Sequence, residues 1–355
     1  MGTTRYVYNK ALYAVKTDGL KFNTFDLRNR FVTHKRAGVV NAEIKKWELE
    51  TPKDIRTGGI ADLVKGFEVA MENLSHGIIK KRFKMNYRIK KKDYTIVIPK
   101  TALNIRDKML FLYPSYTKEG IRMCKDKTLK NLTFEHDCRL QYKHGEWYLI
   151  VPIDIKCDEE KREKTSMCAL DPGGTTFQTT YSETETIKIQ QNSEVLTSLH
   201  AKLDLFQSLR AKKLISSSHY TRRIRRLHKR LYSLIDELHF KTINYLTKNY
   251  NWILLPMFES QDMAMKGFNK KSNRNLIQLK HFTFRERLKS KCMLIRTTDV
   301  SIVTEDYTSK TCTRCGYVKY DLRNAKIYEC NDCNLICERD VVGARNILLK
   351  HLKGS

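Results

Sequence analysis

Two cysteine pairs near the C-terminus carry the most specific chemical pattern in the chain. Cys312 with Cys315 and Cys330 with Cys333 give the spacing C-x₂-C-x₁₄-C-x₂-C. Each pair can form a turn that aims two thiolates at one ion, and two pairs complete the tetrahedral shell that Zn²⁺ prefers. Because such a quartet leaves no open position, we predict one structural zinc ion. The other cysteines are scattered, which is typical of reduced, buried thiols.

Acidic side chains stand where strand-like runs end or a helix begins. Asp171 ends the apolar run Met167–Leu170 before a Gly-rich turn, and Glu305 follows the run Val300–Thr304. Asp340 stands near the start of a C-terminal helical pattern, where its ordinary role would be an N-cap. An Asp-Pro-Gly-Gly sequence alone is a common turn, so only the combination of acids indicates chemistry.

Carboxylates gathered from separate elements can hold divalent cations for phosphodiester hydrolysis. One Mg²⁺ ion generates a nucleophilic hydroxide, and a second ion about 3.5–4 Å away stabilises the leaving oxygen. An aspartate that bridges both ions, with an acidic residue on either side, is the minimum ligand set. We therefore predict a site for two Mg²⁺ ions built from Asp171, Asp340 and a third acid.

The third acid has two candidates. Glu259 follows the apolar run Trp252–Phe258, and Glu305 follows the next strand-like run. Pro256 cannot donate to a strand ladder, so the first strand should be bulged or lie at a sheet edge there. Alternation along the second strand places Glu305 on the same face as Val303. Strand geometry favours Glu305, and Glu259 remains the alternative.

The elements that must position these residues change along the chain. Residues 1–75 show helical spacing of apolar side chains, whereas residues 76–160 contain short β-prone runs that predict a small β-barrel or sheet domain. The charged segment 157–164 is the best boundary. Beyond it, strand-like and helical runs alternate, which indicates an α/β domain over residues 161–310 and 335–355. The cysteine-bearing ribbon, residues 311–334, is inserted in this domain.

The charge balance predicts a polyanionic partner. The 355 residues include 67 Lys and Arg against 39 Asp and Glu, and 67 − 39 gives a net charge of +28. Such an excess destabilises a compact chain unless a polyanion neutralises it. Basic residues cluster in two stretches free of acids, 78–92 and 210–230, although a solvated helix face is the ordinary alternative. The predicted nucleic-acid contacts are Lys80, Lys81, Arg82, Lys84, Arg88, Arg222, Arg223, Arg225, Arg226 and Arg230.

The sequence also predicts the protein's surroundings. It contains no apolar stretch of about 18 residues and no signal-peptide core at its start, so we expect an intracellular protein without a membrane partner. In a eukaryotic host the basic runs could serve nuclear import; otherwise the cytoplasm is expected. No protein oligomer is required.

The C-terminal motifs resemble those of TnpB proteins, the transposon-encoded relatives of type V CRISPR effectors. The resemblance rests on Tyr307–Gly316, on the second cysteine pair and on Arg339–Leu348. Asp171–Thr179 and Leu255–Glu259 are more similar to Fanzor proteins, the eukaryotic and giant-virus branch. Earlier matches extend the resemblance over nearly the whole chain: Arg5–Leu12, Thr51–Arg56 and Glu135–Leu140.

This resemblance implies an RNase H-like (RuvC) nuclease domain with an inserted zinc ribbon, preceded by a helical recognition lobe and a wedge-like β-barrel. It implies an RNA-guided DNA endonuclease, in which a guide RNA made from the transposon end pairs with target DNA and the RuvC domain cuts. Family members usually have a β-segment before the Arg5–Leu12 motif, so we expect the barrel to lack a strand. TnpB usually has Glu where this chain has Pro256, and Fanzor-type proteins resemble the arrangement found here.

Two other functions fit the same residues. A nucleic-acid-binding protein descended from such an enzyme would bind with a steep salt dependence but would not cut. A transposase would join strands, and a resolvase would cut branched DNA without any RNA. Sequencing the nucleic acid that co-purifies with the protein separates these alternatives.

Overall fold

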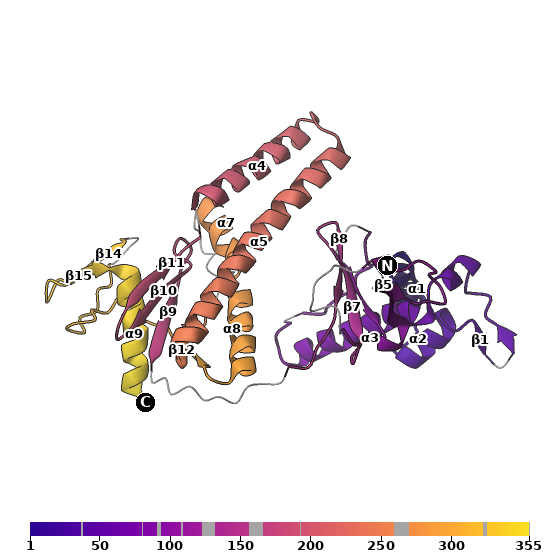
Figure 1. Cartoon of the computed structure of the whole chain (residues 1–355), viewed down its shortest axis with the longest axis horizontal. Coiled ribbons are helices and arrows are strands. Elements are labelled where there is room, and N and C mark those ends of the chain that lie inside the picture. Colours follow the sequence, from indigo (N-terminus) through magenta and orange to yellow (C-terminus); the bar gives the residue numbers. More distant parts are fainter. Residues whose placement is uncertain are drawn as a thin grey trace. The chain divides into compact units, whose positions relative to one another are not determined.

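The chain divides into two compact units, Met1–Asp154 and Ile155–Ser355 (Figure 1). The computed structural model describes residues 1–36, 38–79, 81–90, 94–107, 109–122, 132–155, 166–191, 193–258, 270–321 and 325–354. The charged segment 157–164 lies outside these residues, so the boundary predicted there stays a prediction.

The N-terminal part of the first unit is helical, as its apolar spacing predicts. Its elements are α1 (Gly2–Thr17), α2 (Thr24–Phe31), β1 (Lys35–Arg36), β2 (Val39–Val40), the 3₁₀ helix η1 (Lys46–Glu50) and α3 (Lys53–Ser75). Ile60, Leu63 and Val64 of α3 are buried in a core shared with α1 and α2. The Asn23 side chain caps α2 by accepting from the amides of its first turn.

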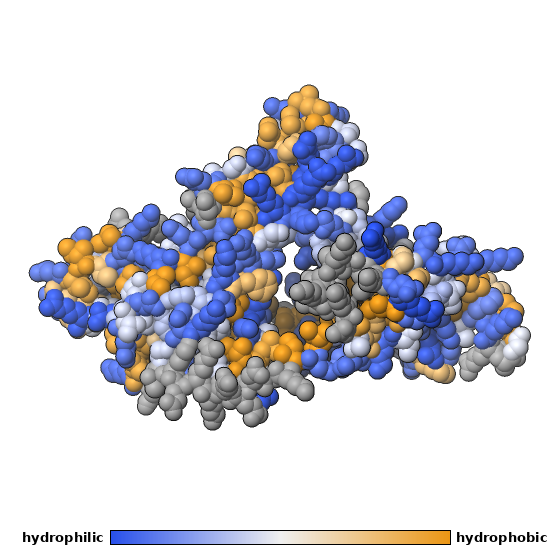
Figure 2. Space-filling model, viewed as in Figure 1, coloured by the Kyte–Doolittle hydropathy of each residue, from blue (hydrophilic) through white to orange (hydrophobic). Residues whose placement is uncertain are grey.

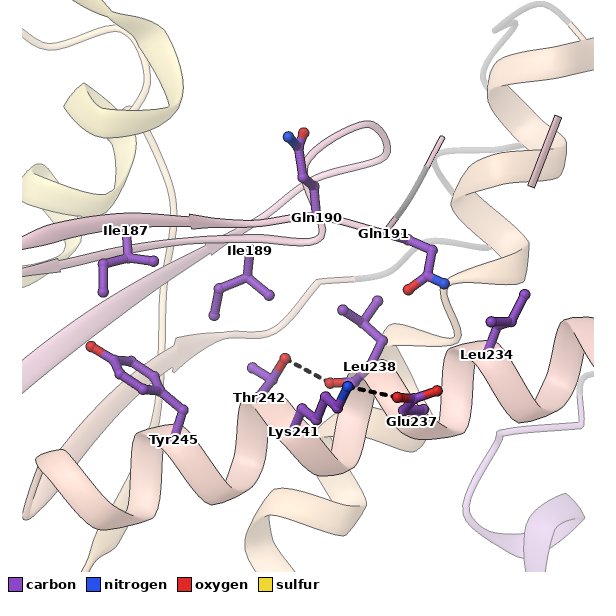
Figure 3. Close-up of a pocket in the computed structure, with 10 residues that line it drawn as sticks. All are labelled: Ile187, Ile189, Gln190, Gln191, Leu234, Glu237, Leu238, Lys241, Thr242 and Tyr245. Atoms are coloured by element: carbon purple, nitrogen blue, oxygen red, sulfur yellow. Dashed lines mark hydrogen bonds and ion pairs between the residues drawn. The ribbon is translucent and has the colours of Figure 1, made fainter. Parts of the chain in front are cut away.

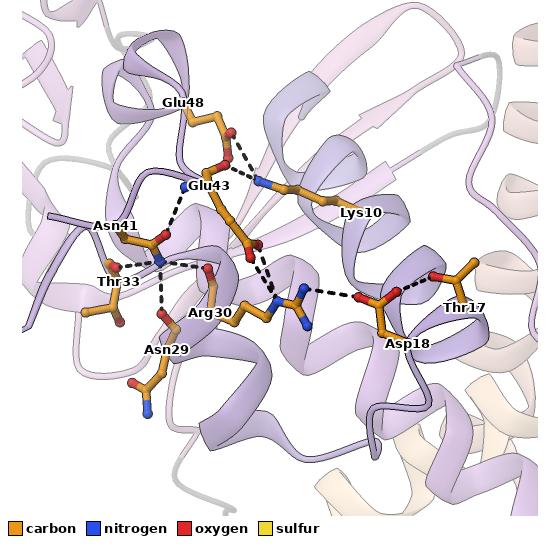
Figure 4. A network of polar contacts seen from close by, with 9 residues as sticks. All are labelled: Lys10, Thr17, Asp18, Asn29, Arg30, Thr33, Asn41, Glu43 and Glu48. Carbon is orange, nitrogen blue, oxygen red and sulfur yellow. Dashed lines mark hydrogen bonds and ion pairs between the residues drawn. The ribbon is translucent and has the colours of Figure 1, made fainter.

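A polar network fixes the loop that follows α2 (Figure 4). The Asn41 side chain donates to the Arg30 carbonyl at 2.8 Å and accepts from the Glu43 amide at 3.0 Å. The Arg30 guanidinium in turn pairs with Glu43 at 3.1 Å and with Asp18 at 3.1 Å. Because these bonds satisfy the loop's polar groups locally, the loop can lie against the helices without losing hydrogen bonds.

The second half of this unit is built from two antiparallel three-stranded sheets. One has the order β3 (Tyr94–Ile98), β7 (Cys138–Lys143), β8 (Glu146–Ile150), and the other has the order β4 (Leu103–Arg106), β5 (Met109–Leu112), β6 (Ile121–Arg122), with η2 (Lys100–Ala102) between β3 and β4. Ile98, Leu103 and Cys138 belong to one core shared by both sheets. Among the residues described, no strand pairing joins the two sheets into a closed barrel.

A five-stranded mixed sheet organises the second unit, which confirms the predicted α/β class. Its order is β11 (Thr186–Ile189), β10 (Gln178–Ser182), β9 (Met167–Pro172), β12 (Trp252–Pro256), β13 (Asp299–Val303). The strands β9, β12 and β13 are parallel to one another, and β10 is antiparallel to both of its neighbours, β9 and β11. The other elements are α4 (Ser193–Ala211), α5 (Ser217–Asn249), α7 (Lys270–Gln278), α8 (His281–Ile295), β14 (Ile327–Glu329), β15 (Ile336–Glu338) and α9 (Arg339–Gly354).

Helices cover both faces of this sheet (Figure 1). On one face Cys168 and Leu170 of β9 pack against residues of α5 and α8. On the other face Ala169 packs against Ile347 and Leu348 of α9. Since side chains alternate along a strand, residues of β9 with odd numbers face α9.

Pro256 does not lie at a sheet edge, so one of the two alternatives expected from the sequence, a bulge or an edge, is wrong. β12 is the strand between β9 and β13, and Pro256 is its last residue, opposite Val303. The ladder between β12 and β9 ends at Leu254. The proline is tolerated because the strand pairing on the β9 side has already ended where its missing N–H would be needed.

The helices α4 and α5 form a hairpin that extends away from the sheet (Figure 1). Leu199 and Leu203 of α4 pack against Leu231 of α5 in a small core of their own. Figure 2 shows hydrophilic and hydrophobic residues side by side on the viewed face of this hairpin, with hydrophobic ones at its tip. No helix within the described ranges is both long and apolar enough to cross a membrane.

Candidate functional site: the cysteine cluster and the carboxylate face

The four predicted cysteine ligands form one compact cluster. Their sulfur atoms all lie within 4.8 Å of one another, with Cys312 and Cys333 3.6 Å apart and Cys315 and Cys330 3.5 Å apart. The sulfurs of a ZnS₄ tetrahedron are about 3.8 Å apart, whereas disulfide sulfurs are about 2 Å apart. The amide of Arg314 also points at the Cys312 sulfur, at 3.4 Å. This donor set fits one structural zinc ion.

The cysteine cluster packs directly on the first turns of α9. Tyr328 of β14 is fully buried among Cys312, Cys330 and Val342 of α9. Its hydroxyl donates to the Lys310 carbonyl at 3.2 Å. The ribbon therefore supports the end of α9 at which Asp340 stands.

Asp171, Glu305 and Asp340 come from three separate parts of the chain that meet on the α9 side of the sheet. Asp171 lies in β9, two residues after Ala169, so it faces α9. Glu305 follows β13, two residues after Val303, which packs in the same cluster as Ala169. Asp340 lies in the first turn of α9.

The electrostatics link the three carboxylates. Burial, and after it the negative charges of Asp340 and Glu305, raise the pKa of Asp171 to about 8, and the positive charge of Arg339 opposes the rise. Burial also raises the pKa of Glu305. A cation beside Asp171 would favour its ionised form, and hard carboxylate oxygens are the ligands that Mg²⁺ prefers.

The carboxylates are near one another without forming a closed ligand shell. In the part of the chain that the structure describes, only two clusters have all their ligand atoms within 4.8 Å: the four cysteines, and Glu135 with His136 and Asp154. All three residues of the second cluster are exposed. Glu259, the alternative third acid, lies outside the described residues, so the choice between Glu259 and Glu305 stays open.

Gly343 of α9 lies directly against Asp171. A Cβ atom at Gly343 would stand 2.7 Å from Oδ2 and 3.1 Å from Cγ of Asp171. A side chain at this position would therefore collide with the carboxylate unless Asp171 moved. The helix can approach β9 this closely because the residue is glycine.

Two buried histidines support the turn that follows Asp171. His281 Nε2 lies 3.0 Å from the Gly173 carbonyl, and the Phe177 ring stacks between His281 and His239, with ring centroids 5.2 Å from each. Burial lowers the pKa of both histidines to about 4, so both are neutral at physiological pH. A proton on Nε2 of His281 would then donate to Gly173 and hold the turn in place.

The predicted basic contacts fall into three groups. Arg222, Arg223, Arg225, Arg226 and Arg230 are all exposed on α5, as are Lys81, Arg82 and Lys84 in the first unit. Arg88 is engaged within its own unit, 2.9 Å from Asp62 and over the Tyr8 ring at 4.2 Å. Lys80 lies outside the described residues.

A groove on the opposite face of the sheet contains none of the predicted site residues (Figure 3). It has a volume of about 410 Å³ and lies between β11 and α5. Ile187, Ile189 and Leu238 give it apolar walls, and Glu237 pairs with Lys241 at 2.6 Å beside it. Glu237 is the one carboxylate among its described lining residues, so the groove lacks the cluster of acids that a two-metal site needs.

Comparisons with known proteins agree with the resemblance of the motifs. The family model described as Cas12f1-like, TNB domain, matches residues 281–347, which include all four clustered cysteines and Asp340. Two cryo-EM structures are similar only at low TM-scores. A Cas12f1–sgRNA–target DNA complex has a TM-score of 0.41 and 14% identity, covering 97% of this chain and 91% of that chain. CasPhi-2 bound to crRNA and phosphorothioate-DNA has a TM-score of 0.38 and 11% identity, covering 98% and 89%.

Curated relatives match nearly the whole chain. A protein of Paramecium bursaria Chlorella virus 1 named "Putative transposase" is 32% identical over 98% of this chain and 81% of its own length. A TnpB-like protein of Acanthamoeba polyphaga mimivirus is 28% identical over 81% of this chain. This chain spans about half the length of the mimivirus relative, 55%. The chain belongs to the TnpB-like family of transposon-associated proteins.

Proposed function

We propose that the protein is an RNA-guided DNA endonuclease that hydrolyses phosphodiester bonds at sites paired with a transposon-derived guide RNA. Its family membership supports this proposal. The observation that carries it is the half-buried carboxylate of Asp171, which lies against Gly343 and within electrostatic reach of Asp340 and Glu305. Such an arrangement is unfavourable without a cation and is what a metal-dependent nuclease requires.

The proposed roles follow from the positions of the residues. Two Mg²⁺ ions would supply the hydroxide nucleophile and stabilise the leaving oxygen. Asp171 would hold both ions, with Asp340 and Glu305 on either side. His281 and Gly343 would fix the position of Asp171, the first through the turn and the second by leaving room for the carboxylate. The zinc ion would hold the ribbon against α9 and take no part in the reaction.

The finer domain assignments belong to the same proposal. Residues 1–75 would form the recognition lobe and residues 76–160 the wedge-like domain for the guide RNA scaffold. Residues 161–310 and 335–355 would form the RuvC domain, with the zinc ribbon 311–334 inserted. Placement in the Fanzor branch is supported by Pro256 and by the Asp171–Thr179 motif.

Gly343→Val tests whether cleavage depends on the position of the Asp171 carboxylate. The new side chain would displace the Asp171 carboxylate, and a displacement of about 1 Å can reduce a rate ~10²-fold. We expect this loss in single-turnover cleavage of a matched plasmid. Gly58→Val is the matched control because a Cβ at Gly58, in α3, meets nothing within 4 Å. Equal cleavage by the two variants would contradict the proposed role of Gly343.

Neutralising the exposed arginines of α5 should weaken nucleic-acid binding without changing which nucleic-acid sequence the protein prefers. Each lost phosphate contact reduces the slope of log K against log salt by about one. We expect the combined change of Arg222, Arg226 and Arg230 to Gln to reduce that slope by about two to three. The control is Lys241→Gln on the same helix, because Lys241 is already paired with Glu237. Binding measured by fluorescence anisotropy across a salt series tests this, and an unchanged slope would remove α5 from the interface.

A binding protein that does not cut is the second candidate. It is favoured by the spacing of the carboxylates, whose oxygens do not form a closed cluster, and by Pro256 at the end of the central strand β12. The experiment is to sequence the RNA that co-purifies with the protein and to incubate the complex with a matched plasmid in Mg²⁺. Cleavage that requires both the RNA and Mg²⁺ supports the endonuclease. Specific RNA without any cleavage supports the binding protein, and cutting of branched DNA without RNA supports a resolvase.

A further inference from the structure

Asn346 of α9 uses its buried side chain to bind a different segment of the chain. Asn346 lies one turn beyond Gly343 on the same side of the helix, and it is only 8% exposed. Its Nδ2 atom donates to the carbonyl of Thr308 and to the carbonyl of Thr311, both at 2.7 Å. Both hydrogens of the amide are therefore used on one short loop.

That loop connects Glu305 to Cys312, the first zinc ligand. Thr308 closes a turn on Glu305, because its amide and its hydroxyl both donate to the Glu305 carbonyl, at 3.2 and 2.8 Å. Tyr307 within this turn has a φ of +63°, which a bulky side chain rarely adopts. A strained turn of this kind persists only where surrounding contacts determine it. Asn346 provides such contacts from α9.

We propose that Asn346 is a positioning residue that fixes Glu305 relative to Asp340 and joins both to the zinc ribbon. Asp340 and Asn346 belong to the same rigid helix, so holding the loop to Asn346 also fixes where Glu305 stands with respect to Asp340. The same loop continues into Cys312, which links the carboxylates to the metal cluster of the ribbon. The role given to Glu305 rests on the proposed function, whereas the clamp on the loop is a property of the fold.

The test compares Asn346→Ala and Asn346→Asp with wild type in the full-length protein. Alanine removes both donors, and aspartate keeps the shape but places a carboxylate against two carbonyl oxygens. Asn249→Ala is the control, because Asn249 is an exposed asparagine of α5 whose amide makes a hydrogen bond to the Tyr245 carbonyl at 2.9 Å. Three quantities are measured: amide hydrogen exchange at Thr308 and Thr311, zinc content, and Mn²⁺ binding followed by electron paramagnetic resonance.

We expect exchange at Thr308 and Thr311 to become about tenfold faster or more in both Asn346 variants, with one zinc per chain retained. The half-saturating Mn²⁺ concentration should rise about tenfold, and the control should match wild type in all three measurements. Unchanged exchange would overturn the clamp. Faster exchange with unchanged Mn²⁺ affinity would overturn the proposal that Asn346 positions Glu305. A loss of zinc accompanied by general unfolding would also overturn it, because the role of Asn346 would then be structural. Faster exchange in a protein whose wild type binds no Mn²⁺ would support the clamp and reject the proposed metal site.

Discussion

Asp171→Asn is expected to abolish DNA cleavage while leaving the protein folded. The asparagine keeps the size of the side chain but removes the charge proposed to hold the cations, and the lost transition-state stabilisation of several kcal/mol corresponds to a rate at least ~10³-fold lower. The measurement is single-turnover cleavage of a matched plasmid by the protein–RNA complex in Mg²⁺. Guide and target binding should be unchanged, because Asp171 is half-buried beneath α9, beside Gly343, and not on a basic surface.

The same substitution should also stabilise the metal-free protein. Burial and the neighbouring carboxylates raise the pKa of Asp171 to about 8, so the native state disfavours its ionised form. For an acid whose pKa is raised by folding, the loss of stability grows as pH rises from the unfolded pKa towards the folded one. Asp171→Asn removes this loss, so the unfolding temperature should rise at neutral pH. Asp306→Asn, one residue beyond Glu305, is the control and should keep full cleavage. Full activity of Asp171→Asn would reject the catalytic assignment.

Removing the zinc ligands is expected to have the largest effect on the C-terminal part of the second unit. Binding of a structural zinc ion contributes on the order of 10 kcal/mol to folding in small zinc domains. Cys312→Ser combined with Cys330→Ser should therefore release the zinc and unfold the ribbon. Because Tyr328 and Val342 pack with these cysteines, the first turn of α9 should lose support and cleavage should fall below detection.

Zinc content by mass spectrometry and amide exchange along α9 measure this effect directly. Cys337→Ser is the matched control, since Cys337 packs in the same apolar cluster but lies outside the four-sulfur cluster. It should keep one zinc per chain and full activity. A protein that retained zinc after loss of Cys312 and Cys330, or that never bound zinc, would contradict the assignment of the cysteines.

Local spacing explains why the cysteine cluster and the strand ends could be predicted. Each cysteine pair forms its own local turn, so the cluster of four cysteines could be predicted without knowing the rest of the fold. Asp171 was placed by an apolar run followed by a Gly-rich turn, and this run forms β9. Alternation along β13 likewise indicated that Glu305 shares a face with Val303. In each case the information lies within about ten residues of sequence.

The residues that hold the carboxylates in place could not be predicted in this way. In the sequence, nothing distinguishes Gly343 from any other glycine near a helix start. Only its contact with Asp171 in the structure shows why a side chain does not fit there. The contacts of His281 with Gly173 and of Asn346 with Thr308 join positions far apart in sequence. A bulge or a sheet edge was expected at Pro256 because the sequence did not show that the ladder to β9 ends at Leu254.

The most direct test of the shared metal site is crystallographic. Crystals of the full-length protein with its RNA would be soaked in Mn²⁺, and anomalous difference density would be recorded near the manganese edge. We expect peaks bounded by Asp171, Asp340 and Glu305, with these carboxylates drawn closer together than in the metal-free chain. Density elsewhere, or no density in a complex that still cuts its matched DNA, would contradict the account.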